Sequence, residues 1–150
     1  MTRPLVGPEL AERLRAAVPG AVVDANDSDV WVRSEDIRKV CSFLREDADT
    51  AFDFLVAITS VDYVDYFEVV YRLTSLRHNH SAILKTRAYE RDEPVVPSVV
   101  AVWKGADLQE REVFDLMGVR FEGHPGLKRI LTWEGFEGHP LRKDFLLQRP

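Results

Sequence analysis

The sequence predicts an α+β fold: a two-layer domain in which a mainly antiparallel sheet packs against helices, followed by an extended, turn-rich C-terminal tail. Three observations support this prediction. Helical and strand patterns alternate through residues 1–118, and the central strands have hairpin-length connections. Residues 119–150 hold four of the eight glycines and three of the eight prolines. We therefore divide the chain into an α+β domain, residues 1–118, and a tail, residues 119–150.

The N-terminal part is expected to form a helix followed by two short strands. Within residues 7–20, Leu10, Leu14 and Val18 recur at helical spacing and would share one face. Residues 21–33 contain two short runs rich in valine on either side of a polar turn, which is typical of paired strands.

A second helix is predicted to begin at Ser34, because serine suits an N-cap and two acidic residues follow it. Its apolar face would hold Ile37, Val40, Cys41 and Leu44. We interpret Cys41 as a small core residue rather than a reactive thiol.

Residues 52–65, 66–76 and 81–90 are rich in β-branched and aromatic residues and are expected to form strands. The alternation is clearest in the second of these. One face would carry Phe67, Val69, Tyr71 and Leu73, and the other Glu68, Val70 and Arg72. Short connections indicate antiparallel pairing, because parallel strands need long crossovers.

A third helix is predicted from about Asp107 to a C-terminal cap at Gly118, after Pro94 and Pro97 break the sheet. Its apolar stripe would contain Leu108, Val113, Leu116 and Met117. The tail that follows is expected to be poorly ordered unless a partner holds it.

The charge of the chain is uneven. Residues 1–118 carry 14 Lys/Arg against 21 Asp/Glu, a net charge of −7, and residues 119–150 carry 6 against 4, a net charge of +2. This hints at an acidic partner surface for the tail but is too weak for nucleic-acid binding. The single cysteine excludes an internal disulfide and an iron–sulfur cluster held by four thiolates of this chain. We expect neither a signal peptide nor a membrane span.

The five residues Phe-Glu-Gly-His-Pro occur twice, at 121–125 and 136–140. Zinc needs three or four ligands, and neither a cysteine pair nor a close histidine pair on a helix supports His124 and His139. We therefore predict that this chain has no metal site. Residues 78–80, which contain the other two histidines, are expected to cap a turn.

Carboxylates cluster on the third helix, where Glu112 and Asp115 are three residues apart and share a face. Buried carboxylate pairs can perform acid–base catalysis, but with Glu110 and Arg111 beside them a solvated ion-pair network is the preferred interpretation. Nucleotide-binding glycine motifs and a recognisable nucleophile setting are absent from the sequence. We therefore predict an assembly subunit without catalytic or cofactor-binding residues.

Residues 110–145, "EREVFDLMGVRFEGHPGLKRIL" followed by "WEGFEGHPLRKDF", closely resemble the signature of the C subunit of NADH-quinone oxidoreductase, the thirty-kilodalton subunit family of respiratory complex I. The likeness covers about residues 50–145. Matching positions include Glu110, Arg111, Glu112, Asp115, Gly118, Phe121, Gly123, His124, Pro125, Leu127, Arg129, Ile130, Leu131, Gly138, His139, Pro140, Leu141, Arg142, Lys143 and Asp144. Met117 and Leu108 depart from the aromatic residues common in the family, but both suit an apolar helix face.

The resemblance implies a cofactor-free subunit in the peripheral arm of a proton-translocating NADH:quinone oxidoreductase, held at the cytoplasmic face of the membrane through the complex. Iron–sulfur clusters, FMN, NADH and quinone would belong to other subunits. The tail would lie on the quinone-site subunit, which is related to hydrogenase large subunits. Its expected contact residues are His124, Pro125, Arg129, His139, Pro140, Arg142, Lys143 and Asp144.

Related domains also occur in membrane-bound hydrogenases and in complexes fed by reduced deazaflavin or ferredoxin. The electron donor is therefore left open, because that specificity lies in other subunits. A free-standing small-molecule enzyme is the remaining alternative, from a different class of protein. Because the chain has one cysteine and no nucleotide-binding motif, we expect no oxidoreductase activity from the isolated chain.

Overall fold

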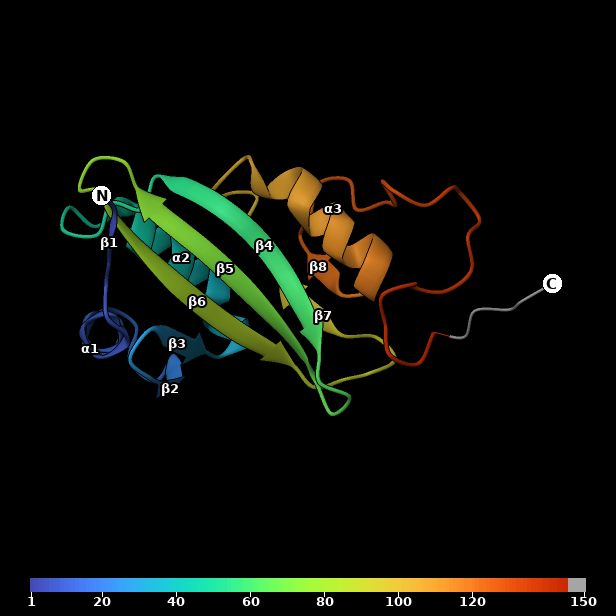
Figure 1. Cartoon of the computed structure of the whole chain (residues 1–150), viewed down its shortest axis with the longest axis horizontal. Coiled ribbons are helices and arrows are strands. Elements are labelled where there is room, and N and C mark those ends of the chain that lie inside the picture. Colours follow the sequence, from blue (N-terminus) through green and yellow to red (C-terminus); the bar gives the residue numbers. More distant parts are fainter. Residues whose placement is uncertain (146–150) are drawn as a thin grey trace.

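The computed structural model describes residues 1–145, which form three α-helices, eight strands and one 3₁₀ turn (Figure 1). The helices are α1 (Gly7–Ala17), α2 (Ile37–Glu46) and α3 (Ala106–Met117), and the 3₁₀ turn is Ser34–Asp36. The strands are β1 (Arg3–Pro4), β2 (Val22–Ala25), β3 (Asp29–Val32), β4 (Phe54–Asp62), β5 (Phe67–Ser75), β6 (His80–Ala88), β7 (Val95–Pro97) and β8 (Arg120–Glu122). Residues 146–150 of the predicted tail lie outside the described residues.

The predicted α+β class is confirmed. The main sheet has the order β2-β3-β6-β5-β4, with β1 added beside β6. The β4-β5, β5-β6 and β2-β3 pairs are antiparallel, as the hairpin-length connections predict, whereas β6 pairs in parallel with β3 and β1. These two parallel pairs were not predicted, because they join residues about 50 and 77 positions apart.

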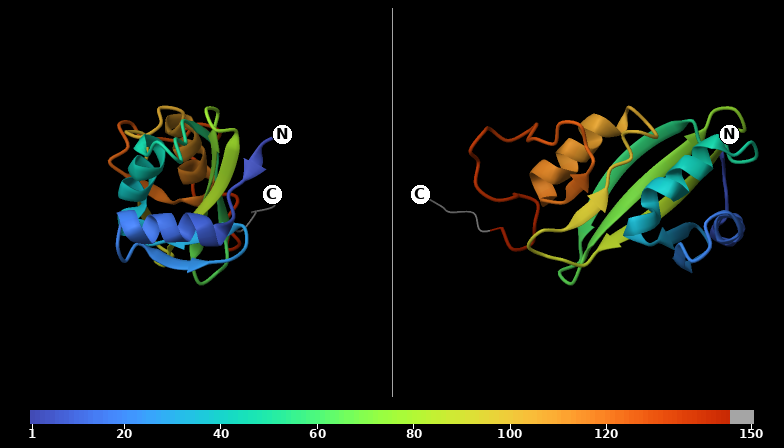
Figure 2. Two further views of the ribbon diagram at one scale, coloured as in Figure 1. Left: turned by 90° about the vertical axis from the view of Figure 1, so that its left-hand side faces the viewer. Right: turned by 180° about the vertical axis from the view of Figure 1, so that it is seen from behind.

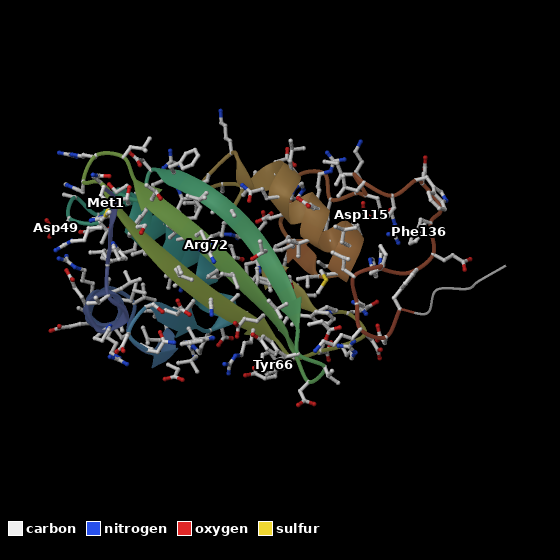
Figure 3. The ribbon with its side chains drawn as sticks, in the orientation of Figure 1. Met1, Asp49, Tyr66, Arg72, Asp115 and Phe136 are labelled. Carbon is white, nitrogen blue, oxygen red and sulfur yellow. The ribbon has the colours of Figure 1, made fainter. Side chains whose placement is uncertain are left out.

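The core lies between the sheet and its helices. In Figure 2, α2 and α3 lie on the same side of strands β4 and β5, so one face of the sheet is covered. Phe67, Val69, Tyr71 and Leu73 of β5 are buried as predicted, and Arg72 is exposed on the uncovered face (Figure 3). Glu68 and Val70, which were predicted to share the face of Arg72, are also buried, so burial does not alternate along the whole strand. Burial of such large side chains is the main stabilising contribution to the fold.

The first two helices also follow their predicted patterns. Leu10 and Leu14 of α1 are fully buried, as are the four predicted residues of α2. Ser34 was wrongly expected to be a side-chain cap: it begins the 3₁₀ turn, and its hydroxyl makes no cap hydrogen bond. Cys41 is fully buried. Its burial, and to a smaller extent the nearby Glu110 carboxylate, raise the pKa of its thiol well above the ordinary value.

Two segments that flank α3 form a second, small sheet. Residues 95–97 leave the main sheet, as the two prolines predict, but they pair in parallel with β8. Val119, directly before β8, and Phe121, within β8, are buried. The first residues of the predicted tail therefore belong to the core. Leu108 was wrongly assigned to the apolar stripe of α3, because it is 58% exposed; Val113 and Met117 are buried as predicted.

Candidate functional site

The candidate functional site comprises α3 and residues 123–145, which we call the wrapping segment because they fold back along α3 (Figures 1 and 2). All eight predicted interface residues lie in this segment, and the five signature residues lie on α3 or directly after it. The helix ends at Gly118, which has a φ angle of +77°. A side chain at this position would collide with His139 and Arg142 of the wrapping segment, so glycine permits both the turn and the close approach.

The wrapping segment caps the C-terminus of α3. The last carbonyls of a helix lack partners within the helix and favour a positive charge. Here His139 Nδ1 donates to the Asp115 carbonyl (2.9 Å), and the Leu141 backbone amide donates to the Leu116 carbonyl (2.9 Å). Arg142 donates from Nε to the Met117 carbonyl at 2.6 Å. Burial lowers the pKa of His139, which favours the neutral imidazole, and its Nδ1–H makes the bond to Asp115.

The first copy of the repeated motif contacts the opposite end of the same helix. His124 Nε2 lies 3.1 Å from the Asp107 carbonyl oxygen and 3.0 Å from its carboxylate, in the first turn of α3. The Gly126 amide donates to His124 Nδ1 at 2.9 Å, so the imidazole carries its proton on Nε2. The two histidines of the repeat therefore fasten the two ends of one helix, and among residues 1–145 no cluster of three potential metal ligands occurs.

Asp115 is a fully buried carboxylate around which the wrapping segment turns (Figure 3). One oxygen accepts the backbone amides of Ile130 (3.1 Å), Leu131 (2.7 Å) and Thr132 (2.9 Å). The other accepts the Thr132 hydroxyl and Arg129 Nη1, the latter at 3.0 Å. Burial alone would raise the pKa of Asp115, but these hydrogen bonds outweigh it and hold the pKa well below its ordinary value.

Glu110 is also fully buried, and it holds the segment that follows β7. Its carboxylate accepts the Ser98 hydroxyl at 2.6 Å and the Val99 amide at 2.7 Å. Burial raises its pKa. The interpretation of this run as a solvated ion-pair network was therefore wrong for Glu110 and Asp115, since each carboxylate is enclosed by hydrogen-bond donors. Glu112 is exposed to solvent, but among residues 1–145 it forms no ion pair.

Arg111 completes the attachment of α3 to the wrapping segment. Its guanidinium donates to the carbonyls of Lys128 and Arg129, both at 3.1 Å. Arg129 in turn bridges Asp115 and the Gly138 carbonyl (2.8 Å), which joins two distant parts of the segment. Glu110, Arg111 and Asp115 thus hold chain segments around α3.

A second attachment joins the wrapping segment to the main sheet. Arg91 forms a two-pronged ion pair with the buried carboxylate of Asp62, with both distances at 2.8 Å. The Lys143 backbone amide donates to the same carboxylate at 2.9 Å, and Asp144 pairs with Arg91 at 3.1 Å. The hydrogen bonds from Arg91, opposed by burial, hold the pKa of Asp62 well below its ordinary value. Asp62 and Arg91 were missed by the sequence analysis, because their partners lie far along the chain.

The structure thus places every predicted interface residue, and it shows that several are used within the chain. Contacts with α3 and with Asp62 hold the tail within this chain, and its ordering by a partner stays a prediction. Arg142, predicted to bind a partner group, donates within this chain to the carbonyls of Met117, Gly118 and Arg91. Pro125 is exposed and Pro140 is partly buried, and each directly follows one of the two fastening histidines. Direct contact of these residues with a partner stays a prediction.

The chain matches one family model over residues 30–150, that of the respiratory-chain NADH dehydrogenase 30 kDa subunit. It is 46% identical over 140 residues to the NADH-quinone oxidoreductase C subunit of Roseiflexus sp. (strain RS-1), a match that covers 89% of this chain and 80% of the relative. The protein of the same name from Acidithiobacillus ferrooxidans (strain ATCC 53993 / BNL-5-31) is 45% identical over 148 residues, covering 92% and 72%.

A solved structure shares the fold. A chain in the structure of the membrane-bound sulfane sulfur reductase, an archaeal respiratory membrane complex, superposes with a TM-score of 0.73 at 27% sequence identity. The match covers 93% of this chain and 85% of that chain.

Proposed function

Because the chain belongs to the family of the 30 kDa subunit of respiratory-chain NADH dehydrogenase, we propose that it is a peripheral subunit of a proton-translocating NADH:quinone oxidoreductase. Its role there is structural: it contributes to assembly next to the quinone-site subunit and performs no redox chemistry itself. The identity of 45–46% to two C subunits of NADH-quinone oxidoreductase supports this assignment over most of the chain.

The observation that carries the structural role is the use made of the signature residues. Glu110, Arg111 and Asp115 all hold neighbouring backbone in place, and the two repeated histidines fasten the ends of α3. Charged residues in these positions keep an irregular surface segment in one shape. A rigid surface loses less conformational entropy when it binds a partner, which suits a subunit whose task is assembly.

We propose further that the redox groups belong to other subunits: iron–sulfur clusters, FMN, NADH and quinone. The single cysteine supports this division, because it is buried among apolar residues and cannot supply four thiolates. The subunit would be held at the cytoplasmic face of the membrane through its partners. Within residues 1–145, no helix is long and apolar enough to span a bilayer.

Purification of the native complex through a tag on this chain tests the proposal. We expect the purified complex to contain a flavoprotein that oxidises NADH and a subunit related to hydrogenase large subunits, and to catalyse NADH:quinone reduction. The isolated chain should be colourless and inactive with NADH. An isolated chain that oxidises NADH or carries a stoichiometric redox group would refute the structural role.

A second candidate follows from the solved structure. The matching chain is part of a respiratory membrane complex described as a sulfane sulfur reductase, so the same fold occurs outside proteins named NADH-quinone oxidoreductase. The equivalent subunit of such a complex, or of a hydrogenase, deazaflavin- or ferredoxin-fed complex, is therefore the alternative. Its 27% identity, against 45–46% for the two relatives, favours the first proposal. A purified complex without an NADH-oxidising flavoprotein would favour the second.

A further inference from the structure

The Asp115 carboxylate orients a loop whose side chains the chain itself does not bury. The three backbone amides that it binds belong to residues 130–132. Leu131 is 63% exposed, Trp133 is 70% exposed and Ile130 is 36% exposed. Burying a charge costs free energy unless the charge is well paired. The buried Asp115 carboxylate is paired with the backbone of this exposed apolar loop and thereby fixes the shape of the loop. We call residues 130–133 the apolar loop.

Neighbouring groups also hold the apolar loop in place. Arg111 binds the two carbonyls directly before it, and Arg129 binds Asp115 and Gly138 on either side. Behind the loop, Trp133 packs edge-on against Phe136 with ring centroids 4.8 Å apart, and Phe136 stacks on Phe145. Figure 3 shows Phe136 in this segment, at the end of the molecule remote from Met1. The apolar side chains are therefore presented in a fixed arrangement.

We propose that the apolar loop inserts into an apolar pocket, rimmed by lysine or arginine, on a neighbouring subunit of the complex. This inference rests on the proposed function. Leucine and tryptophan side chains that already have their bound conformation before docking are effective anchors, because they lose little rotational freedom on binding. The charges beside the loop indicate that the rim of the pocket is basic.

Those charges differ from what the sequence suggests. The net charge of +2 of the tail pointed to an acidic partner, but Arg129 and Arg142 are bound to carbonyls and carboxylates of their own chain. Glu134 directly follows Trp133 and Glu137 directly follows Phe136; both are exposed, and within the described part of the chain neither forms an ion pair. They outnumber the one exposed cation close to the loop in sequence, Lys128. A basic rim complements these two carboxylates.

The same carboxylates disfavour other partners. An anionic membrane surface would repel Glu134 and Glu137, although it could accept tryptophan and leucine at its interface. A second copy of this chain would have to receive the apolar loop on a different surface, because the loop cannot complement itself by charge. Such a head-to-tail contact tends to continue into open chains of molecules rather than close.

The test compares matched substitutions in the full complex. Leu131→Ser removes one anchor, and Leu76→Ser is its control, because Leu76 is 70% exposed in the turn between β5 and β6 at the opposite end of the molecule. Each variant is expressed with a tag in place of the natural chain, and the fraction in the complex is measured on native gels. Thermal unfolding of the isolated variants shows that both fold.

We expect Leu131→Ser to reduce incorporation about tenfold and Leu76→Ser to leave it unchanged, as loss of one hot-spot anchor does. Glu134→Lys should reduce incorporation more than Glu12→Lys, a charge reversal on the exposed face of α1. Equal incorporation of the two leucine variants would overturn the inference. The inference would also be overturned if the wild-type chain forms a dimer on size exclusion and Leu131→Ser abolishes that dimer. The same holds if the wild-type chain binds phosphatidylcholine–phosphatidylglycerol vesicles and Leu131→Ser abolishes that binding.

The outcomes separate this inference from the proposed function. If wild-type chain copurifies with a complex that lacks an NADH-oxidising flavoprotein, the proposed electron donor is wrong, but the leucine comparison still tests the loop. If wild-type chain copurifies with the NADH-oxidising subunit and Leu131→Ser does so equally well, only the loop inference is wrong.

Discussion

Replacement of Asp115 by asparagine tests the central feature of the site with the smallest change of shape. Asparagine can turn its amide oxygen toward the three backbone amides of residues 130–132, and Thr132 can reverse its hydroxyl to accept from the amide NH₂. Arg129 cannot adapt, because it is a donor only and loses its carboxylate partner at 3.0 Å. The substitution therefore removes the charge and one ion pair while leaving most of the packing intact.

The expected loss is about 3 kcal/mol, the lower end of the range for removing one partner of a buried ion pair. It falls at the lower end because Arg129 is 21% exposed and can recover some hydration. For a domain of this size, that loss corresponds to a Tm roughly 6 to 12 °C lower. Glu112→Gln is the control, because it removes the same charge from an exposed position of the same helix and should change stability by less than about 0.5 kcal/mol.

The pH dependence gives a second measurement. Because the folded-state pKa of Asp115 lies below its unfolded value of about 3.9, its stabilisation is fully present above that pH and is lost as the pH falls toward the folded-state pKa. The stability difference between wild type and Asp115→Asn should be constant from about pH 5 to 8 and shrink below about pH 4.

Urea unfolding at several pH values and amide exchange at residues 130–132 are the assays. Equal stability of Asp115→Asn and Glu112→Gln, with unchanged exchange at these amides, would refute the account of Asp115 as the organiser of the wrapping segment. Faster exchange with unchanged global stability would confine its role to the loop and contradict the magnitude given above.

Three further predictions concern other parts of the structure. Arg142→Ala should lower stability by about 2 kcal/mol, because charge-assisted bonds to the end of α3 are lost. It should also lower the amount of assembled complex more than it lowers turnover per complex. Native gels measure assembly and quinone-reductase activity measures turnover; lost turnover at normal assembly would contradict the prediction. Asp62→Asn should lower stability by about 3 kcal/mol and increase amide exchange at Lys143, whereas protection equal to wild type would argue against this attachment. Cys41 should react with a thiol reagent only as fast as the protein unfolds in urea, because burial excludes the reagent and raises the thiol pKa; rapid labelling in buffer would contradict its place in the core.

The sequence could predict those parts of the fold that depend on local pattern. Alternation in β5 and the helical spacing of Leu10 and Leu14 report which face is buried, and Gly118 indicates where α3 ends. Leu108 shows the limit of this reasoning. An apolar residue at a suitable spacing points to solvent at 58% exposure, because the pattern cannot tell which side of α3 has a neighbour.

The sequence indicated which residues belong to the candidate site, but not which hydrogen bonds they make. The resemblance identified the signature residues, yet a run of alternating charges gave no sign that Glu110 and Asp115 are buried. Four of their partners are backbone amides 11 to 17 residues away, and backbone groups carry no sequence signal. The Asp62 attachment is harder still, because Lys143 contributes through its amide, 81 residues from the carboxylate.

The fastening of α3 from both ends has a consequence for biosynthesis. Arg142 follows Met117 by 25 residues, so at about 5–20 residues per second the ribosome delivers this cap roughly one to five seconds after the helix it completes. When His124 emerges beside the first turn, residues 129–132 and 139–142 are not yet made, so the Asp115 carboxylate and the last carbonyls of α3 are without their partners. The nascent helix is therefore secured at its beginning before its end. If the apolar loop docks as proposed, it takes its docking shape only after residues 129–132 have emerged and bound Asp115.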